Sequence, residues 1–269
     1  MTIPVATRCS CTDPARVVNQ PTQAAHQAMP VPAIRIQGLT KQRGGKTVLS
    51  GLDLVVPEGD CMGLVGVNGA GKTTLLKCLL DLDAATSGEI AVFNRKHSLA
   101  AARARLAYLP EQFRPPGYLN GWEFLRYTSG LHGNEFNRER VREVMDILDL
   151  EIAELDKLAI RLSKGTARKL GLAACLLSGK KLLVMDEPMS GLDPRARVCL
   201  QTHLLELKRQ GVTCFFTTHL LVDAEKLCDS IAILHRGGIR YIGSPAACCR
   251  HFNAVDLEQA FLRCVGGAR

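Results

Sequence analysis

The stretch LVGVNGAGKTTLLK, residues 64–77, decides the fold. An apolar run typical of a buried strand leads into glycines and then into residues with helical spacing. Residues 66–73 match G-x-x-x-x-G-K-[ST], in which the glycines allow several backbone N–H groups to face one anion. The pattern requires a strand before the loop and a helix after it, and both are present. The sequence therefore predicts a loop that binds the phosphates of a nucleotide.

The residue types of this loop predict separate contacts to the phosphates and to a metal. The helix beginning near Lys72 adds the positive end of its dipole. Lys72 is expected to reach the β- and γ-phosphates, the Thr73 hydroxyl to coordinate Mg²⁺, and Thr74 to contact the α-phosphate. A glycine-rich turn that only packs a strand on a helix would not need these side chains. The other expected phosphate-binding residues are Gly66, Asn68, Gly69, Ala70 and Gly71.

A second run, LLVMDEP at residues 182–188, ends in two carboxylates. Its apolar residues predict a buried strand, and Asp186 at the strand end is placed to hold Mg²⁺ through water. Glu187 is placed to polarise a water molecule for in-line attack on the γ-phosphate. An acidic turn stopped by Pro188 is the alternative, disfavoured by a phosphate loop in the same sheet. The pair predicts nucleotide hydrolysis.

The stretch LSKGTARKLGLAACLL, residues 162–177, is typical of a capped helix start. Ser163 takes the N-cap position, Gly165 is flexible, and an apolar-rich helix follows. Capped helix starts are common, so the stretch alone is ambiguous. A free helix N-terminus with a serine hydroxyl is nevertheless a second anion site. Two such sites make sense if a second copy of the chain supplies this helix to the opposite face of the nucleotide.

Strand and helix patterns alternate along most of the chain, which implies a mostly parallel sheet covered on both faces. A helical region interrupts the alternation between about residues 113 and 178, where residues 141–148 have helical spacing. Residues 1–32 are rich in Pro, Gln, Ala and Thr and predict a disordered tail. The strands expected are residues 33–39, 52–57, 61–66, 89–93, 105–110, 181–186, 212–219, 230–237 and 238–243.

Taken in order, these motifs resemble those of the ATP-binding subunit of an ABC transporter, over about residues 34–245. Residues 66–74 match the Walker A motif and residues 182–187 the Walker B motif with its catalytic glutamate. Residues 162–166 resemble the LSGGQ signature, residues 190–193 the D-loop, and His219 the switch histidine.

The resemblance implies an α/β fold of the P-loop NTPase (RecA-like) type. A parallel-sheet core would carry an antiparallel β subdomain and an inserted helical subdomain. The ABC ATP-binding domain would span residues 33–245, followed by a short helical extension at 246–269.

The same resemblance implies a site shared between two subunits, either a homodimer or a paired ATPase subunit. Two ATP molecules with Mg²⁺ would lie between them, each signature closing over the partner's γ-phosphate through Ser163 and Gly165. His219 would hold the γ-phosphate and the attacking water, and Asp193 would couple the two sites. The expected catalytic residues are Lys72, Glu187 and His219.

The chain departs from the family pattern at the signature and at the Q-loop. Lys164 and Thr166 stand where Gly and Gln are usual, although the anion-facing serine and glycine are kept. Glu111 occupies the position of the Q-loop glutamine and Gln112 follows it. Either residue is a candidate for sensing the metal.

The aromatic residue that stacks on adenine in the family is also missing. Arg43 occupies its position, and a guanidinium plane can stack on a base. Val48 is expected to add an apolar contact. These residues put base selectivity in doubt but leave the phosphate chemistry unchanged.

Composition limits the partners. The 269 residues carry a formal net charge of +8, but the basic residues are scattered and suit solvated faces plus one phosphate site. The 11 cysteines lack metal-finger spacing and indicate a reducing compartment without a disulfide framework. No run approaches ~18 apolar residues, so work at a membrane is expected to need a separate spanning subunit.

Two functions remain open. In the first, the chain is the motor of a transporter, acts at the cytoplasmic face of the cell membrane and drives a separate transmembrane permease. The YLPE and LSKG sequences favour export over import, although they do not fix the direction of transport. The transported substance cannot be read from this chain. In the second, it is a soluble ABC-type ATPase acting on DNA or ribosomes. The coiled-coil insertions, zinc modules and second nucleotide unit usual in such relatives are missing, so no nucleic-acid partner is expected.

The helical region would receive the permease in family terms. Residues 114–133 are the expected contact, and its candidate anchors are Trp122, Phe124, Leu125 and Tyr127. About half of these side chains are expected to belong to the core of the helical region instead.

Overall fold

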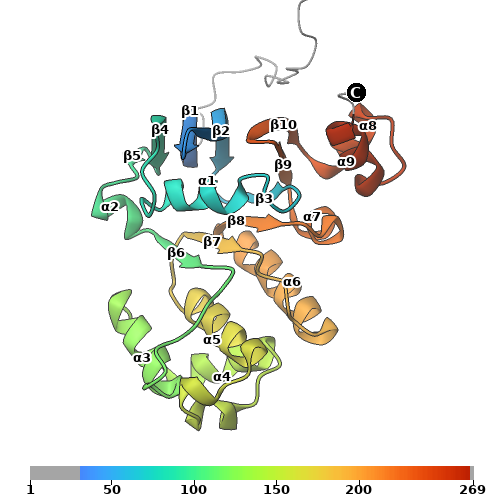
Figure 1. The fold of residues 1–269 in the computed structure, drawn as a ribbon. Coiled ribbons are helices and arrows are strands. Elements are labelled where there is room, and N and C mark those ends of the chain that lie inside the picture. The colour runs from blue at the N-terminus through green and yellow to red at the C-terminus, as the bar shows by residue number, and fades with distance from the viewer. Residues whose placement is uncertain (1–30, 267–269) are drawn as a thin grey trace, which may run out of the picture.

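A six-stranded sheet forms the centre of the computed structural model, which describes residues 31–266. The strand order is β10-β9-β3-β8-β7-β6 (Figure 1). β9, β3, β8, β7 and β6 run parallel, and only β10 is antiparallel to its neighbour. The strands are β3 (Cys61–Val65), β6 (Leu106–Leu109), β7 (Leu182–Asp186), β8 (Thr213–Thr218), β9 (Ser230–His235) and β10 (Gly238–Gly243).

A four-stranded antiparallel sheet in the order β2-β1-β4-β5 lies above the central sheet in Figure 1. β1 begins at Pro32, and residues 1–30 of the predicted tail lie outside the described residues. The expected combination of a parallel core with an antiparallel subdomain is confirmed. The strands are β1 (Pro32–Arg43), β2 (Lys46–Pro57), β4 (Ser87–Val92) and the short β5 (Arg95–Lys96).

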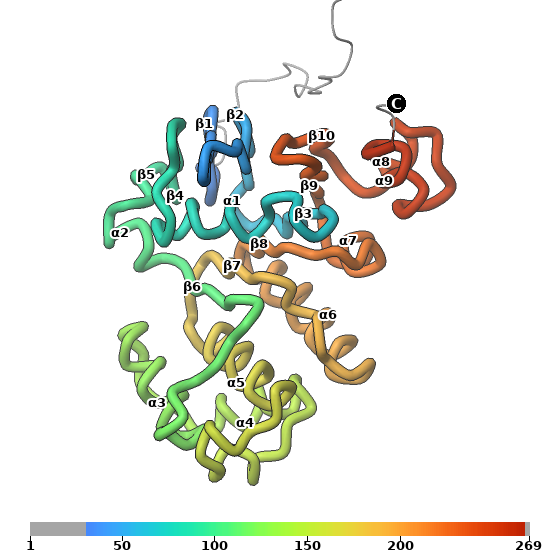
Figure 2. Tube along the Cα trace, in the orientation of Figure 1, coloured from blue at the N-terminus to red at the C-terminus, as the bar shows by residue number. Residues whose placement is uncertain are grey.

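Helices cover both faces of the central sheet, and α3, α4 and α5 form a separate lobe beyond β6 and β7 (Figure 2). No helix among residues 31–266 is long and apolar enough to cross a membrane. The helices are α1 (Lys72–Leu79), α2 (Ala100–Arg103), α3 (Gly121–Leu131), α4 (Arg138–Ile147), α5 (Lys164–Leu176), α6 (Pro194–Arg209), α7 (Leu221–Leu227), α8 (Pro245–His251) and α9 (Leu257–Gly266), with 3₁₀ turns η1 (Ile152–Asp156) and η2 (Ala159–Arg161).

Side chains of the parallel strands alternate between two hydrophobic cores. Leu64 and Phe215 belong to the core that contains α1 and the antiparallel sheet. Val65 and Phe216, the next residue along each strand, belong to the core that contains the helical lobe and α6. This period of two explains why the strands read as continuous apolar runs, since both faces of the sheet are buried.

One buried hydroxyl joins the ends of two neighbouring strands. Thr217 of β8 pairs in register with Asp186 of β7 and with Leu64 of β3. The Thr217 Oγ1 donates a hydrogen bond to Asp186 Oδ1 and accepts one from the Glu187 N–H at 2.9 Å. Thr217 is fully buried, so no solvent can replace these bonds.

The Thr217→Val substitution is expected to lower the free energy of unfolding by about 1–3 kcal/mol. Valine keeps the shape of the side chain but leaves the Glu187 N–H without its acceptor and Asp186 without its donor. Urea denaturation measures the change. Thr202→Val is the control, because Thr202 is exposed on α6 and its hydroxyl bonds only the Val198 carbonyl. A shift within about 0.5 kcal/mol is expected there; equal shifts would contradict the role of Thr217.

Candidate active site

The phosphate loop joins β3 to α1 at the edge where the parallel strands end. A Cβ on Gly66 would lie 2.5 Å from the Leu234 carbonyl oxygen, so only glycine fits. Gly71 is the N-cap of α1 and has a φ of +112°, which L side chains rarely adopt. No side chain caps α1. Its first N–H groups, which lack intrahelical partners, are therefore left to an anion held by the loop.

Lys72, Glu187 and His219 form one connected set of contacts below this loop. Lys72 is only 7% exposed, and its Nζ donates to the Gly66 carbonyl at 2.7 Å and lies 3.4 Å from Glu187 Oε1. Glu187 Oε2 lies 2.8 Å from His219 Nδ1. The structure thus brings together the three side chains that the sequence predicted as catalytic, although they are distant in the chain.

Glu187 has an unusual backbone conformation. Its φ of +53° falls in the left-handed region, which for a non-glycine residue costs of order 1–3 kcal/mol. The Glu187 N–H donates to Thr217, and its carbonyl accepts from Arg168 and from the Ser190 N–H. Hydrogen bonds on both sides of the residue therefore hold it in this conformation.

Asp186 has an oxygen suited to a cation. The carboxylate is 1% exposed, Oδ1 accepts from Thr217, and Oδ2 has no hydrogen-bond partner among residues 31–266. A buried carboxylate oxygen is costly unless a cation or a water completes it. Together with the half-buried hydroxyl residue Thr73, the position fits the oxygen ligands that Mg²⁺ prefers. No group of three or more His, Cys, Asp or Glu among residues 31–266 is arranged to hold a metal, so phosphate oxygens and water would have to complete the shell.

Glu111 and Gln112 lie in the exposed loop after β6. The Glu111 carbonyl, rather than its carboxylate, makes a hydrogen bond, which it accepts from Arg168. No hydrogen bond joins either side chain to Asp186 in the described part of the chain. Their role toward the metal stays a prediction.

Arg168 is a site residue for which the sequence predicted no role, since it is one of the scattered basic residues. Its guanidinium is buried against the loops after β6 and β7. Burial lowers its pKa from the usual value, and the carboxylates of Glu111, Glu187 and Asp186 oppose that shift. A signal was available: Arg168 precedes Leu172 by one helical turn, and the residues that follow it on this face of α5, Gly171, Leu172 and Cys175, are all buried.

The signature and the D-loop each begin a helix with a capping side chain. Ser163 caps α5 as expected, its Oγ accepting from the Thr166 N–H at 3.0 Å, and it is exposed to solvent. Gly165 is half-buried in the first turn. Asp193 caps α6 by accepting from the Ala196 N–H and also pairs with Lys169 Nζ at 2.9 Å; these contacts lower its pKa to about 2.

The predicted base contacts are less complete. The Arg43 guanidinium forms an ion pair with Asp83, which also pairs with Lys41, and the Arg43 side chain is 52% exposed. The Val48 backbone packs against Gly71 and Gly237, beside the phosphate loop. The Arg43 guanidinium is held by Asp83 in this structure, so its stacking on a base stays a prediction.

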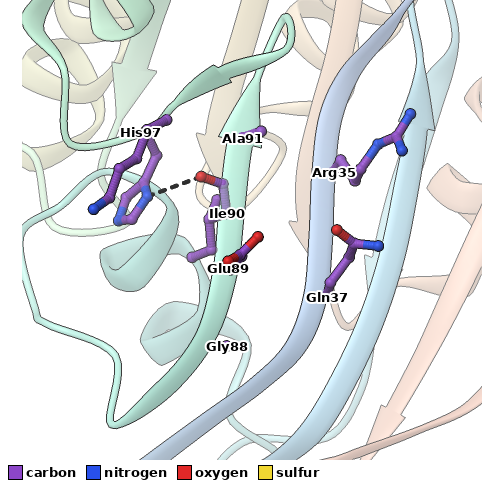
Figure 3. Close-up of a pocket in the computed structure, with 8 residues that line it drawn as sticks. Arg35, Gln37, Gly88, Glu89, Ile90, Ala91 and His97 are labelled. Atoms are coloured by element: carbon purple, nitrogen blue, oxygen red, sulfur yellow. Dashed lines mark hydrogen bonds between the residues drawn. The ribbon is translucent and has the colours of Figure 1, made fainter.

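A separate hollow of about 420 Å³ lies on the antiparallel sheet. Residues of β1, β4 and β5 line it together with His97, whose ring nitrogen contacts the Ile90 carbonyl at 3.0 Å (Figure 3). Its charged residues have mixed signs, Arg35 and Lys96 against Glu89. None of the motif residues lines this hollow, so the nucleotide is assigned to the phosphate loop.

Known proteins with the same arrangement are numerous. A family model described as ABC transporter matches residues 49–190. The chain is 38% identical to a Nod factor export ATP-binding protein I of Rhizobium sp., over 85% of this chain and 76% of that protein. It is 40% identical to an uncharacterized ABC transporter ATP-binding protein of Nostoc sp., over 73% of this chain and 59% of that protein. The chain thus spans less than two thirds of the length of the Nostoc relative. It also spans only 57% of the length of a similar Synechocystis protein.

Solved structures agree on the fold. A structure titled as the ATP binding subunit of an ABC transporter has a TM-score of 0.79 and 27% identity, covering 86% of this chain and 99% of that one. A dimeric ATP-binding cassette described as bound to ADP and Pi has a TM-score of 0.71 at 21% identity, covering 78% of this chain and 98% of that one, and supports the fold alone. With the motifs, the geometry and these matches in agreement, the chain belongs to the ABC transporter family of ATP-binding proteins.

Proposed function

We propose that this protein is the ATP-hydrolysing motor subunit of an ABC transporter. The observation that carries the proposal is the contact set Lys72–Glu187–His219 beneath the phosphate loop, next to the unpartnered Oδ2 of Asp186. A loop that only bound nucleotide would need no carboxylate between its lysine and a histidine. Here the carboxylate is placed to accept a proton from water.

Each residue has a role that follows from its contacts. Lys72 Nζ exchanges the Gly66 carbonyl for β- and γ-phosphate oxygens. Glu187 accepts the proton of the attacking water, and His219, bonded to the same carboxylate, orients that water and the γ-phosphate. Bound Mg²⁺, held by Thr73 and through water by Asp186, would neutralise phosphate charge. These steps amount to hydrolysis of ATP to ADP and phosphate.

The site is proposed to be completed by a second subunit, either a second copy or a paired ATPase. Ser163 is exposed to solvent. Its Oγ accepts a hydrogen bond from the Thr166 N–H and lies 2.9 Å from Thr166 Oγ1, and these contacts orient the start of α5. An exposed helix N-terminus with a serine hydroxyl is suited to meet the γ-phosphate bound by another molecule. Lys169 Nζ pairs with Asp193 at 2.9 Å, so an ion pair links the two segments proposed to face the partner.

Coupling to a membrane permease is proposed through the helical lobe. As expected for about half of the four candidate anchors, two belong to the core: Phe124 is 5% exposed and Leu125 is fully buried, and both face the core between α3 and the sheet. Tyr127 is exposed, and Tyr118 and Ile160 present a larger apolar surface, at 79% and 78% exposure. The Ile160 N–H bonds the Gly117 carbonyl, so these two side chains lie on adjoining segments.

The proposed location is peripheral, at the cytoplasmic face of the membrane. Export is proposed because several relatives are named Nod factor export ATP-binding proteins and because YLPE and LSKG occur here. The substance moved is a property of the permease.

The Lys72→Ala substitution is expected to reduce the ATPase rate of the full chain about 100-fold or more, because it removes the charge that stabilises the transferred phosphoryl group. A coupled phosphate-release assay measures the rate. Lys77→Ala serves as control, since Lys77 is exposed on the same helix. Unchanged hydrolysis in Lys72→Ala would remove the phosphate-loop assignment.

The Glu187→Gln substitution is expected to produce a stable dimer at saturating MgATP, because ATP binds but is not hydrolysed. Size exclusion with light scattering reports the mass. The double variant Glu187→Gln/Ser163→Arg is expected to stay monomeric, since the arginine would obstruct the partner's phosphate. A monomeric Glu187→Gln protein under these conditions would refute the shared site.

Co-expression with a candidate permease, chosen as a neighbouring reading frame that encodes about six apolar spans, tests the coupling surface. Ile160→Asp is expected to abolish co-purification from detergent-solubilised membranes, whereas Val255→Asp, at a site 91% exposed near α9, retains it. Equal recovery of the permease with both variants would count against the helical lobe. Stimulation of hydrolysis by DNA or ribosomes instead of the permease would favour the soluble alternative.

A further inference from the structure

Arg168 joins three parts of the chain that are distant in sequence. It lies in α5, five residues after the capping Ser163, and is 8% exposed. One terminal nitrogen donates to the Glu111 carbonyl in the loop after β6. The other donates to the Glu187 carbonyl and to the Asp186 carbonyl, the latter at 3.2 Å, in the segment that ends β7.

The acceptors of this guanidinium are backbone carbonyls, and in the part of the chain that the structure describes its Nε has no hydrogen-bond partner. A buried cation whose hydrogen bonds all go to neutral groups is costly to maintain. Its two terminal nitrogens nevertheless hold carbonyls of two loops at a fixed separation in one plane, whereas a lysine ammonium offers all its donors from a single rotatable nitrogen. The geometry favours a role in fixing backbone positions over a role in net stabilisation.

The backbone that Arg168 fixes belongs to Glu187. This residue is left-handed, and its carboxylate bridges Lys72 and His219. Thr217 holds the peptide on its N-terminal side, and Arg168 holds the carbonyl on its C-terminal side. The same carbonyl also accepts from the Ser190 N–H at 3.0 Å. A change of φ at Glu187 would move its carbonyl and its Cβ together, and so would swing the carboxylate away from Lys72 and His219.

We propose that Arg168 is a positioning residue for the ATP hydrolysis proposed above: its guanidinium holds Glu187 in the left-handed conformation that aims the carboxylate and ties that conformation to α5 and to the Glu111 loop. The inference rests on the proposed function. It adds a residue outside the recognised motifs, placed between the signature helix and the catalytic carboxylate.

Steady-state kinetics of the full chain carrying Arg168→Met or Arg168→Lys tests this role. Displacement of the carboxylate is expected to lower kcat about 10- to 100-fold in both variants. The KM for ATP and the Kd for MgADP are expected to stay within about threefold, because Arg168 touches neither the phosphate loop nor Lys72. Arg142→Met is the matched control, since Arg142 is exposed on α4, and its kcat is expected to be unchanged. If kcat in Arg168→Lys and Arg168→Met stays within about twofold of the parent, the inference is wrong.

Two further readouts separate positioning from general destabilisation. In a Glu187→Gln background, Arg168→Met is expected to cause no further loss of hydrolysis, because its effect passes through the Glu187 carboxylate; an additive loss would overturn the inference. Hydrogen exchange is expected to speed up at residues 187–190 and 111–113 but not in α6. Faster exchange throughout the chain, or a parallel loss of MgADP binding, would assign Arg168 a purely structural role. If Arg168→Met does not fold, Arg168→Lys decides by the same readouts.

These experiments distinguish the inference from the function on which it rests. A parent protein that binds MgADP but does not hydrolyse ATP would refute the proposed function. The exchange measurement requires no turnover, so unaltered exchange at residues 187–190 in both Arg168 variants would refute the positioning role even then.

Discussion

The in-register pairing of β3, β8 and β7 is the constraint on which the site depends. Parallel strands end at a common edge, so the phosphate loop after β3, the threonine of β8 and the carboxylates after β7 meet there. A shift of one residue in β8 would move Thr217 to the opposite face of the sheet. Asp186 and the Glu187 N–H would then lose their common partner inside the protein. The alternation of Leu64 and Val65, and of Phe215 and Phe216, between two cores opposes such a shift, because each would enter the wrong core.

Charge compensation explains why the side chains predicted to be catalytic lie so close together. Lys72 and Glu187 are each 7% exposed on their side chains, and a single buried charge would be expensive. Their 3.4 Å approach offsets part of that cost, and His219 adds a further partner for the carboxylate. Phosphate binding to Lys72 therefore competes with Glu187 for the same ammonium group. The carboxylate that loses this partner keeps His219, which lies at the open side of the site with 45% of its side chain exposed.

Much of this arrangement could be predicted because its signals are local. Three features each depend on a few adjacent residues, whose types alone indicate their chemistry. They are the phosphate loop, the acidic strand end and the Ser163 cap. Features that arise from tertiary packing were missed or misjudged. The short β5 and α2 have little local signal, the identity of the candidate anchors that face the core depends on how α3 packs, and the Arg43–Asp83 pair joins residues forty positions apart. Arg168 was overlooked because a basic residue on a helix is usually solvated, and only the fold reveals the carbonyls around it.

The links between subdomains suggest how events at one surface reach the chemistry. α5 carries Ser163 at its exposed start, Arg168 one turn later against the Glu187 carbonyl, and Lys169 against Asp193 at the start of α6. A tilt of this short helix would disturb these attachments, and the bonds of Arg168 resist it most because they are buried and have no solvent to replace their partners. Contact of a second subunit with Ser163 and Asp193 and contact of a permease with the lobe would therefore act on one helix. Through Arg168, that helix is hydrogen-bonded to the backbone of Glu187, the residue proposed to accept the proton from water.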